Sequence, residues 1–264
     1  MMSTSTSLSL PYLQRAHLTK NSAGKELFRI MEEKKSNLAI AADVINKKDL
    51  LSIAKALAPH ICILKTHIDM LHDFEPNLLQ ELKLLAKENK FLILEDRKFA
   101  DIGKTVEHQY AKGIYNIADW SDMVTVHSVA GPGTIEALQK IGSPLNRGIL
   151  LLAEMSPKGS PATGSYTEAT IQMAEKYPDF VTGFISQRKL SDHPHIIHMT
   201  PGIHLNVVSG AFDQQYRSPE DAILHSGTDV IIVGTGILHS ENPVKTAIAY
   251  KQAGWDAYQK RINP

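Results

Sequence analysis

The stretch "FLILEDRKFADIG", residues 91–103, decides the fold class, because an apolar run passes directly into a group of charged residues. Residues 91–94 are continuously apolar rather than alternating, which is typical of a strand buried on both faces of a parallel sheet. Asp96, Lys98 and Asp101 follow where that strand ends. The carboxyl ends of parallel strands carry the functional groups of α/β barrels, so this stretch predicts a parallel sheet with a charged site at its edge.

Similar apolar runs recur on both sides of this stretch. They are "NLAIAA" (37–42), "ICILKT" (61–66), "MVTVH" (123–127), "GILLLAEM" (148–155), "VTGFI" (181–185), "IIHM" (196–199) and "VIIV" (230–233). Amphipathic segments at 47–57, 78–88, 166–176 and 219–225 predict helices between them, with further helices at 25–35 and 243–260. Eight strands that alternate with helices predict an α/β fold, a (β/α)₈ barrel.

One connection departs from this pattern. Only residues 186–195 separate the sixth and seventh runs, which is too short for an ordinary crossover helix. A flavodoxin-like doubly wound sheet with extra strands is therefore the alternative fold. Because no internal repeat or linker interrupts the pattern, we expect one barrel domain at residues 23–264. The Ser/Thr-rich start, "MMSTSTSLSL", predicts a disordered tail over residues 1–22.

The composition excludes several classes of partner. Lys and Arg (28) balance Asp and Glu (28), so there is no excess of positive charge for nucleic acid or an anionic membrane. No apolar stretch approaches the length that spans a bilayer. The single cysteine, Cys62, excludes an intrachain disulfide and favours a reducing compartment, so we expect a cytoplasmic protein.

Three successive strands end in charged residues. Asp43 ends the first, Lys65 lies in the second, and Asp96, Lys98 and Asp101 end the third. Taken singly, each has a structural explanation, because the first and last aspartates could cap helices and the first lysine could extend to solvent. Together, acids and amines that alternate at one barrel mouth require mutual neutralisation, which is costly without a function.

Such an array suits a particular chemistry. A lysine flanked by carboxylates stays protonated, because opposite charges favour its ammonium form. It offers a positive charge, and then a proton, to a carbanion, while the same carboxylates hold it in place as charge develops. The array therefore predicts a reaction that generates a carbanion without a cofactor.

At this point the sequence resembles a known family. "LEDRKFADIG" (94–103) is similar to the signature of the orotidine 5′-monophosphate decarboxylase family, in the form typical of fungi and animals, and the likeness runs from about residue 25 to about residue 261. Further matching stretches are "LAIAADV" (38–44), "ICILKTHIDML" (61–71), "AEMSPKGSPATGSYT" (153–167), "MTPGI" (199–203) and "DQQYRSPEDAI" (213–223). The resemblance implies a homodimeric barrel with shared active sites that needs neither cofactor nor metal. It would convert orotidine 5′-monophosphate to UMP, the last step of de novo pyrimidine nucleotide synthesis.

The resemblance also implies roles for the charged residues. Lys98 would donate a proton to carbon 6 of the pyrimidine, and Asp96 would lie beside the departing carboxylate. Lys65 would bridge Asp96 and the ribose, whose hydroxyl groups Asp43 would bind. The partner subunit would contribute two residues to each site, Asp101 and Thr105.

The remaining implied contacts are with the base and the phosphate. Ser156 would contact the pyrimidine edge at the start of a closing lid, residues 156–166. Pro201, in the matching "MTPGI" stretch, is a further expected substrate contact. The phosphate would be held by Gln214 and Tyr216 and by the turn after the eighth strand, which contains Gly234 and Thr235.

This turn departs from the family pattern. The family places an arginine between two glycines to bind the phosphate, whereas here the stretch reads "VGTG" (233–236), with Thr235 between them. The glycines still allow backbone N–H groups to approach an anion, but the bidentate guanidinium is absent. A charged hydrogen bond contributes about 1.5–3 kcal/mol, so we expect weaker binding or slower turnover than in relatives.

Two other functions stay open. One is a metal-dependent phosphosugar decarboxylase or aldolase with the same Asp-x-Lys-x-x-Asp spacing. The other is a non-catalytic protein that binds UMP-like nucleotides, which the threonine at position 235 motivates. A zinc site at "DHPHIIHM" (192–199) is disfavoured, because no cysteine or acidic helix partner completes its histidines, and we expect a solvated loop there.

Overall fold

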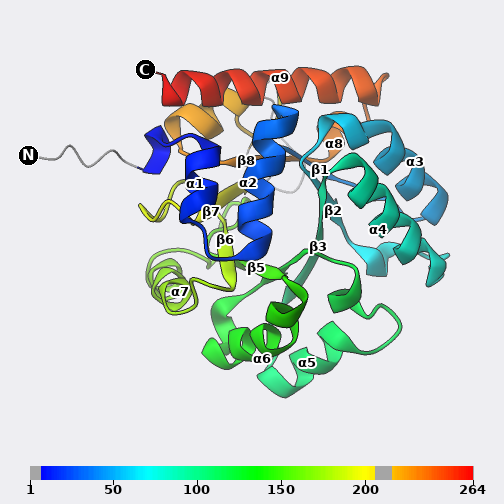
Figure 1. Ribbon diagram of the computed structural model, residues 1–264, viewed down its shortest axis with the longest axis vertical. Coiled ribbons are helices and arrows are strands. Elements are labelled where there is room, and N and C mark those ends of the chain that lie inside the picture. Colours follow the sequence, from blue (N-terminus) through cyan, green and yellow to red (C-terminus); the bar gives the residue numbers. More distant parts are fainter. Residues whose placement is uncertain (1–6, 206–215, 264) are drawn as a thin grey trace, which may run out of the picture.

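The computed structural model describes residues 7–205 and 216–263. Eight parallel strands form a closed barrel in which each strand pairs with the next and β1 pairs with β8 (Figure 1). The strands are β1 (Leu38–Ala41), β2 (Ile63–Thr66), β3 (Leu92–Phe99), β4 (Met123–Val126), β5 (Gly148–Leu152), β6 (Val181–Ile185), β7 (Ile197–Pro201) and β8 (Val230–Val233). Closure confirms the predicted (β/α)₈ barrel and excludes the doubly wound sheet.

Helices surround the barrel (Figure 1). The α-helices are α1 (Tyr12–Leu18), α2 (Ser22–Lys34), α3 (Lys47–Leu57), α4 (Asn77–Asn89), α5 (Gly103–Ala111), α6 (Pro132–Gly142), α7 (Ser165–Glu175), α8 (Thr235–Leu238) and α9 (Pro243–Ile262). A single π-helical turn, Asp221–His225, precedes β8, and 3₁₀ turns occupy Ser7–Ser9, Ala58–His60, Ile68–Met70, Ile117–Asp119, Ser128–Ala130 and Ser143–Leu145. The predicted helices therefore lie within a few residues of their observed bounds.

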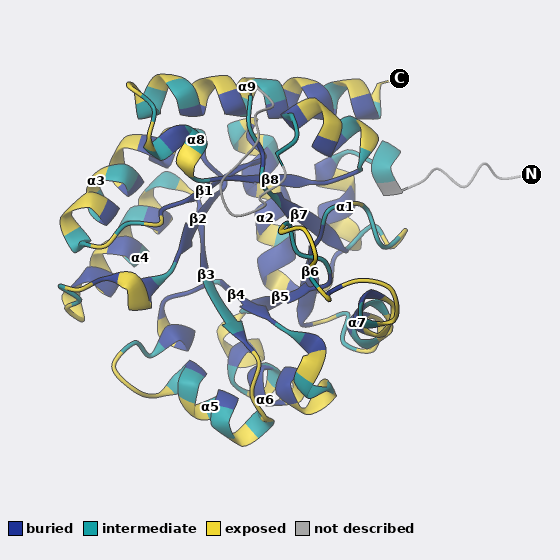
Figure 2. Cartoon of the chain, turned by 180° about the vertical axis from the view of Figure 1, so that it is seen from behind, coloured by how far each residue is buried: buried dark blue, intermediate teal, exposed yellow. Residues whose placement is uncertain are grey.

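The strands are buried on both faces, as their apolar sequences predict (Figure 2). Every residue of β1, β2, β4, β5, β6 and β8 is buried. Two strands are exceptions: Asp96, Arg97 and Lys98 of β3 are only partly buried, and so is Pro201 at the end of β7. The charged residues of β3 therefore lie at the open, carboxyl-terminal end of the barrel.

The short connection between β6 and β7 contains no helix, and the N-terminal helix covers this side of the barrel instead. Arg15 in α1 donates hydrogen bonds to the carbonyl oxygens of Pro194 (2.8 Å) and Ile196 (2.7 Å). The Tyr12 side chain is fully buried and stacks on Tyr258 of α9 with ring centroids 3.9 Å apart. The prediction of a disordered tail over residues 1–22 is thus wrong for α1, which covers the barrel where the crossover helix is missing. Residues 1–6 lie outside the described part of the chain. The barrel domain likewise begins before residue 23.

A buried ion network fastens α1 to the bottom of the barrel. Arg15 makes a bidentate ion pair with Asp229, and Arg261 of α9 donates a hydrogen bond to the same carboxylate at 3.1 Å. Burial alone would raise the pKa of Asp229, but the two guanidinium groups and His198 hold it well below its usual value. The network joins both ends of the described chain to the strand that closes the barrel.

Candidate active site

The ends of β1, β2 and β3 place four charged side chains in one cavity of about 620 Å³. Its lining includes nine of the predicted site residues, Asp43, Lys65, Asp96, Lys98, Ser156, Pro201, Tyr216, Gly234 and Thr235, together with His67, Thr125 and an apolar wall. The wall is formed by Ala41, Leu94, Leu152, Met155, Pro157, Ile185, Gly202, Ile203 and Ile232. A largely apolar cavity with a few convergent polar groups is typical of a small-molecule site.

The four charges form a chain of alternating sign. Lys65 Nζ lies 3.1 Å from Asp43 Oδ1 and 3.2 Å from Asp96 Oδ2. Lys98 Nζ lies 2.8 Å from the same oxygen of Asp96. The structure thus brings the predicted residues together, and Asp96 receives two ammonium groups on one carboxylate oxygen.

The environment of Asp96 keeps its carboxylate ionised. Burial alone would raise its pKa, but the hydrogen bond with His67 and the charges of Lys65 and Lys98 hold the pKa well below its usual value. The side chains of Lys65 and Asp96 are 7% and 13% exposed, so solvent screens their ion pair little, whereas the Asp43 side chain is 43% exposed. The array therefore holds its charges in a fixed arrangement.

Two further polar residues in the cavity were not predicted from the sequence. His67 Nε2 lies 3.3 Å from Asp96 Oδ2, and Thr125 Oγ1 donates a hydrogen bond to Asp96 Oδ1 at 2.7 Å. The sequence contains a signal for each, since His67 lies two residues after Lys65 and Thr125 is a polar residue within an apolar strand.

The alternative explanation of Asp43 and Asp101 as helix caps is not supported. Asn46, not Asp43, caps α3, and α5 begins at Gly103 without a side-chain cap.

Two predicted site residues, Asp101 and Thr105, do not line this cavity, and a third lies outside the described residues. Asp101 is exposed, and its carboxylate accepts a hydrogen bond from the backbone N–H of Ile102 at 2.7 Å. Thr105 lies in the first turn of α5 and does not line the cavity. Gln214 lies outside the described residues.

The lining of the cavity also contains the turn after β8, which lies beside β1. Gly234 and Thr235 lie there near Tyr216, and the Thr235 side chain is exposed. Arg217 does not supply a cation at this turn, because its guanidinium donates hydrogen bonds to the Gln187 carbonyl (2.7 Å) and the Ser226 hydroxyl (3.0 Å). The described side chains thus place no arginine beside Thr235 in the cavity lining.

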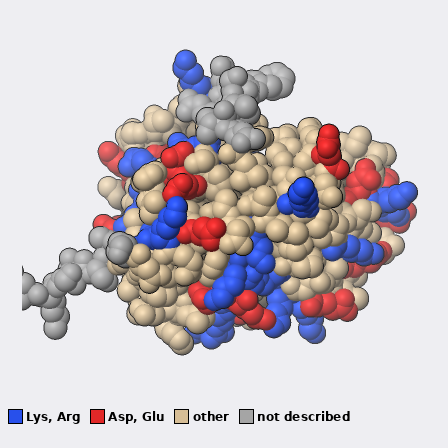
Figure 3. All heavy atoms as spheres, turned by 90° about the horizontal axis from the view of Figure 1, so that it is seen from above, with Lys and Arg blue, Asp and Glu red and all other residues tan. Residues whose placement is uncertain are grey.

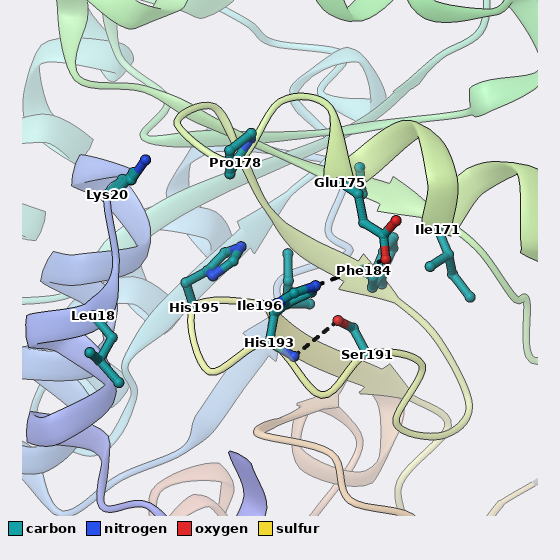
Figure 4. A pocket seen from close by; sticks show the side chains of 11 residues that line it. Leu18, Lys20, Ile171, Glu175, Pro178, Phe184, Ser191, His193, His195 and Ile196 are labelled. Atoms are coloured by element: carbon teal, nitrogen blue, oxygen red, sulfur yellow. Dashed lines mark hydrogen bonds and ion pairs between the residues drawn. The ribbon is translucent and has the colours of Figure 1, made fainter. Parts of the chain in front are cut away.

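The histidine cluster forms a separate feature outside the barrel. His193 and His195 stack with ring centroids 5.4 Å apart beside a cavity of about 280 Å³, where His193 faces Glu175 (Figure 4). His198 points elsewhere, since its buried Nε2 accepts a hydrogen bond from the Leu190 N–H. Within residues 7–205 and 216–263, no group of three or more His, Cys, Asp or Glu side chains is arranged to bind a metal ion.

The surface carries charges of both signs. On the face shown in Figure 3, Lys and Arg side chains are interspersed with Asp and Glu, in keeping with the equal numbers in the sequence. None of the described helices is both long and apolar enough to cross a membrane.

Comparison with known proteins agrees with this geometry. The model of the orotidine 5′-phosphate decarboxylase / HUMPS family matches residues 36–250. The chain is 51% identical to the orotidine 5′-phosphate decarboxylase of Rhizopus oryzae over 96% of each chain, and 48% identical to that of Schizosaccharomyces pombe over 96% of each chain. Among solved structures, the orotidine 5′-monophosphate decarboxylase of Methanocaldococcus jannaschii shares the fold with a TM-score of 0.65 and 22% identity, covering 82% of this chain and 98% of its own. The chain therefore belongs to the orotidine 5′-phosphate decarboxylase / HUMPS family.

Proposed function

We propose that this protein decarboxylates orotidine 5′-monophosphate to UMP and carbon dioxide without a cofactor. The observation that carries the proposal is the array at the barrel mouth, in which Lys98 and Lys65 both contact one oxygen of Asp96. Relatives about half identical over nearly the whole chain are named for this activity.

The reaction needs a site that stabilises negative charge on a ring carbon. When the bond between carbon 6 and the carboxylate breaks, carbon dioxide leaves and the electron pair stays on carbon 6. The Lys98 ammonium faces this developing charge and then transfers a proton from Nζ to carbon 6, which yields UMP and a neutral amine that solvent reprotonates. Asp96 holds this ammonium in place beforehand, and Lys65 in turn holds Asp96, so little reorganisation is needed as the charge forms.

The other residues bind the parts of the substrate that do not react. Asp43 lies next to Lys65, where it would accept hydrogen bonds from the ribose hydroxyl groups. Ser156 and Pro201 line the part of the cavity assigned to the base, and Tyr216, Gly234 and Thr235 line the part assigned to the phosphate. Gln214 is a further phosphate ligand in this proposal.

The active form is a homodimer with shared sites. Four consecutive loops after β1 to β4 each expose one large apolar side chain, with exposed fractions of 60% for Ile45, 41% for Met70, 66% for Ile102 and 68% for Val129. Exposed apolar residues grouped on neighbouring loops are typical of a surface that another protein covers. A second copy seated there would receive Asp101 and Thr105, which neighbour Ile102 and do not enter the cavity of their own chain.

The experiment is an ultraviolet assay of orotidine 5′-monophosphate loss by purified protein in the presence of a metal chelator. Turnover that persists in chelator supports the proposal. Activity that requires added Mg²⁺ and ignores the pyrimidine would favour a phosphosugar decarboxylase or aldolase. A folded dimer that binds UMP but never consumes the substrate would favour a non-catalytic nucleotide-binding protein, the alternative that Thr235 motivates.

A further inference from the structure

The charged end of β3 is not a regular strand. Glu95 pairs with Val124 of β4 and Phe99 pairs with Val126, so the three residues Asp96, Arg97 and Lys98 lie opposite the single residue Thr125. Lys98 has a φ of 51°, in the left-handed region that side chains other than glycine rarely adopt. Such bulges re-aim side chains near active sites, and they persist only where the surroundings hold them.

The hydroxyl group of Thr125 holds both ends of this bulge. It accepts a hydrogen bond from the backbone N–H of Lys98 at 2.9 Å and donates one to Asp96 Oδ1 at 2.7 Å. The threonine is fully buried, so solvent does not compete for these bonds. One hydroxyl therefore uses both its acceptor and its donor capacity on the residues of the charged array.

In this arrangement the two carboxylate oxygens of Asp96 have different hydrogen-bond and ion-pair partners. Oδ1 is occupied by the Thr125 hydroxyl, while Oδ2 receives Lys98 at 2.8 Å, Lys65 at 3.2 Å and His67 at 3.3 Å. The terminal torsion of an aspartate is broad and roughly two-fold, so the carboxylate is not fixed by its own rotamer preference. The hydroxyl supplies the missing constraint.

We propose that Thr125 is a positioning residue that sets where the Lys98 ammonium and the Asp96 carboxylate meet the reacting carbon. This inference rests on the proposed decarboxylation. The residue acts through the bulge and the carboxylate, and it contributes nothing to holding the ribose or the phosphate. Its loss should therefore lower kcat while leaving KM nearly unchanged, because the constraint matters most when charge develops.

Three variants test the inference. Thr125→Val keeps the shape of the side chain and removes the hydroxyl, whereas Thr125→Ser keeps the hydroxyl. Thr182→Val is the matched control, since Thr182 is a buried strand residue whose hydroxyl donates to Asn21 Oδ1 at 2.9 Å, away from the charged array. We expect Thr125→Val to lower kcat about 10- to 100-fold, the range for a lost hydrogen bond to a charged group. Thr125→Ser should retain most of the turnover, and Thr182→Val should lower only the melting temperature.

A binding measurement separates positioning from general structural damage. Thr125→Val should weaken a UMP analogue with an oxyanion at carbon 6 about tenfold or more, yet change the affinity for UMP less than about twofold. Equal weakening of both ligands, unchanged kcat in Thr125→Val, or an equal defect in Thr125→Ser would overturn the inference. An inactive wild-type protein would refute the proposed function instead, so the two failures are distinguishable.

Discussion

Replacing Thr235 with arginine should make this protein a better enzyme. The side chain is exposed at the phosphate end of the cavity, so a longer residue has room there. A hydrogen bond between charged partners contributes about 1.5–3 kcal/mol, which corresponds to about a 10- to 100-fold change in affinity. Because this end of the cavity opens to solvent, screening places the expected gain near the lower limit, about tenfold in kcat/KM.

Steady-state decarboxylation of orotidine 5′-monophosphate by Thr235→Arg measures this gain. Thr235→Gln is the matched control, because it adds a long hydrogen-bonding side chain without the charge. Orotidine, which lacks the phosphate, is the second control. An unchanged kcat/KM in a folded Thr235→Arg variant, or an equal gain with orotidine, would show that a guanidinium at this turn does not act on the phosphate.

Three further predictions concern stability and assembly. Arg15→Ala leaves part of the buried Asp229 charge unpaired and should lower the free energy of unfolding by about 3–5 kcal/mol in urea titrations. The control, Arg29→Ala, removes an exposed ion pair and should change the free energy of unfolding by less than about 0.5 kcal/mol. Burial raises the pKa of Glu95 to about 8, so the folded protein keeps a proton that the unfolded chain releases above about pH 4.3. The contribution of Glu95 to the free energy of unfolding therefore decreases as the pH rises from about 4.3 to about 8. Glu95→Gln should gain stability relative to wild type from about pH 5 to about pH 8, and a difference in free energy of unfolding that does not change with pH would contradict this. Mixing inactive Lys98→Ala and Asp101→Ala proteins should restore about a quarter of wild-type activity through hybrid dimers, and a mixture that stays inactive would argue against shared sites.

The barrel could be predicted from the sequence because its strands are buried on both faces. That burial makes each strand a continuous apolar run, and amphipathic segments between the runs mark the helices. The helix Lys47–Leu57 has its predicted bounds. The N-terminal helix could not be predicted in this way, because the burial of Arg15 depends on Asp229 and on the gap beside residues 186–195, which only the folded chain brings together.

The charged site was predictable for a similar reason. Asp43, Lys65, Asp96 and Lys98 each lie where a strand ends, and parallel strands in a barrel bring these ends to one mouth. The bulge opposite Thr125 is different, because it depends on the register between β3 and β4 and leaves no mark in the spacing of residues along either strand. Pairing between strands, rather than local sequence, determines the direction in which the side chains of the charged array point.

The most direct test of the account is the rate at which Lys98→Ala consumes orotidine 5′-monophosphate in the ultraviolet assay, with Lys90→Ala, at an exposed ion pair, as the control. Loss of both the positive charge and the proton donor should lower kcat/KM by at least about 10³-fold, with the melting temperature unchanged. Lys90→Ala should match the wild type. A Lys98→Ala protein that turns over at the wild-type rate would contradict the central role of this ammonium group.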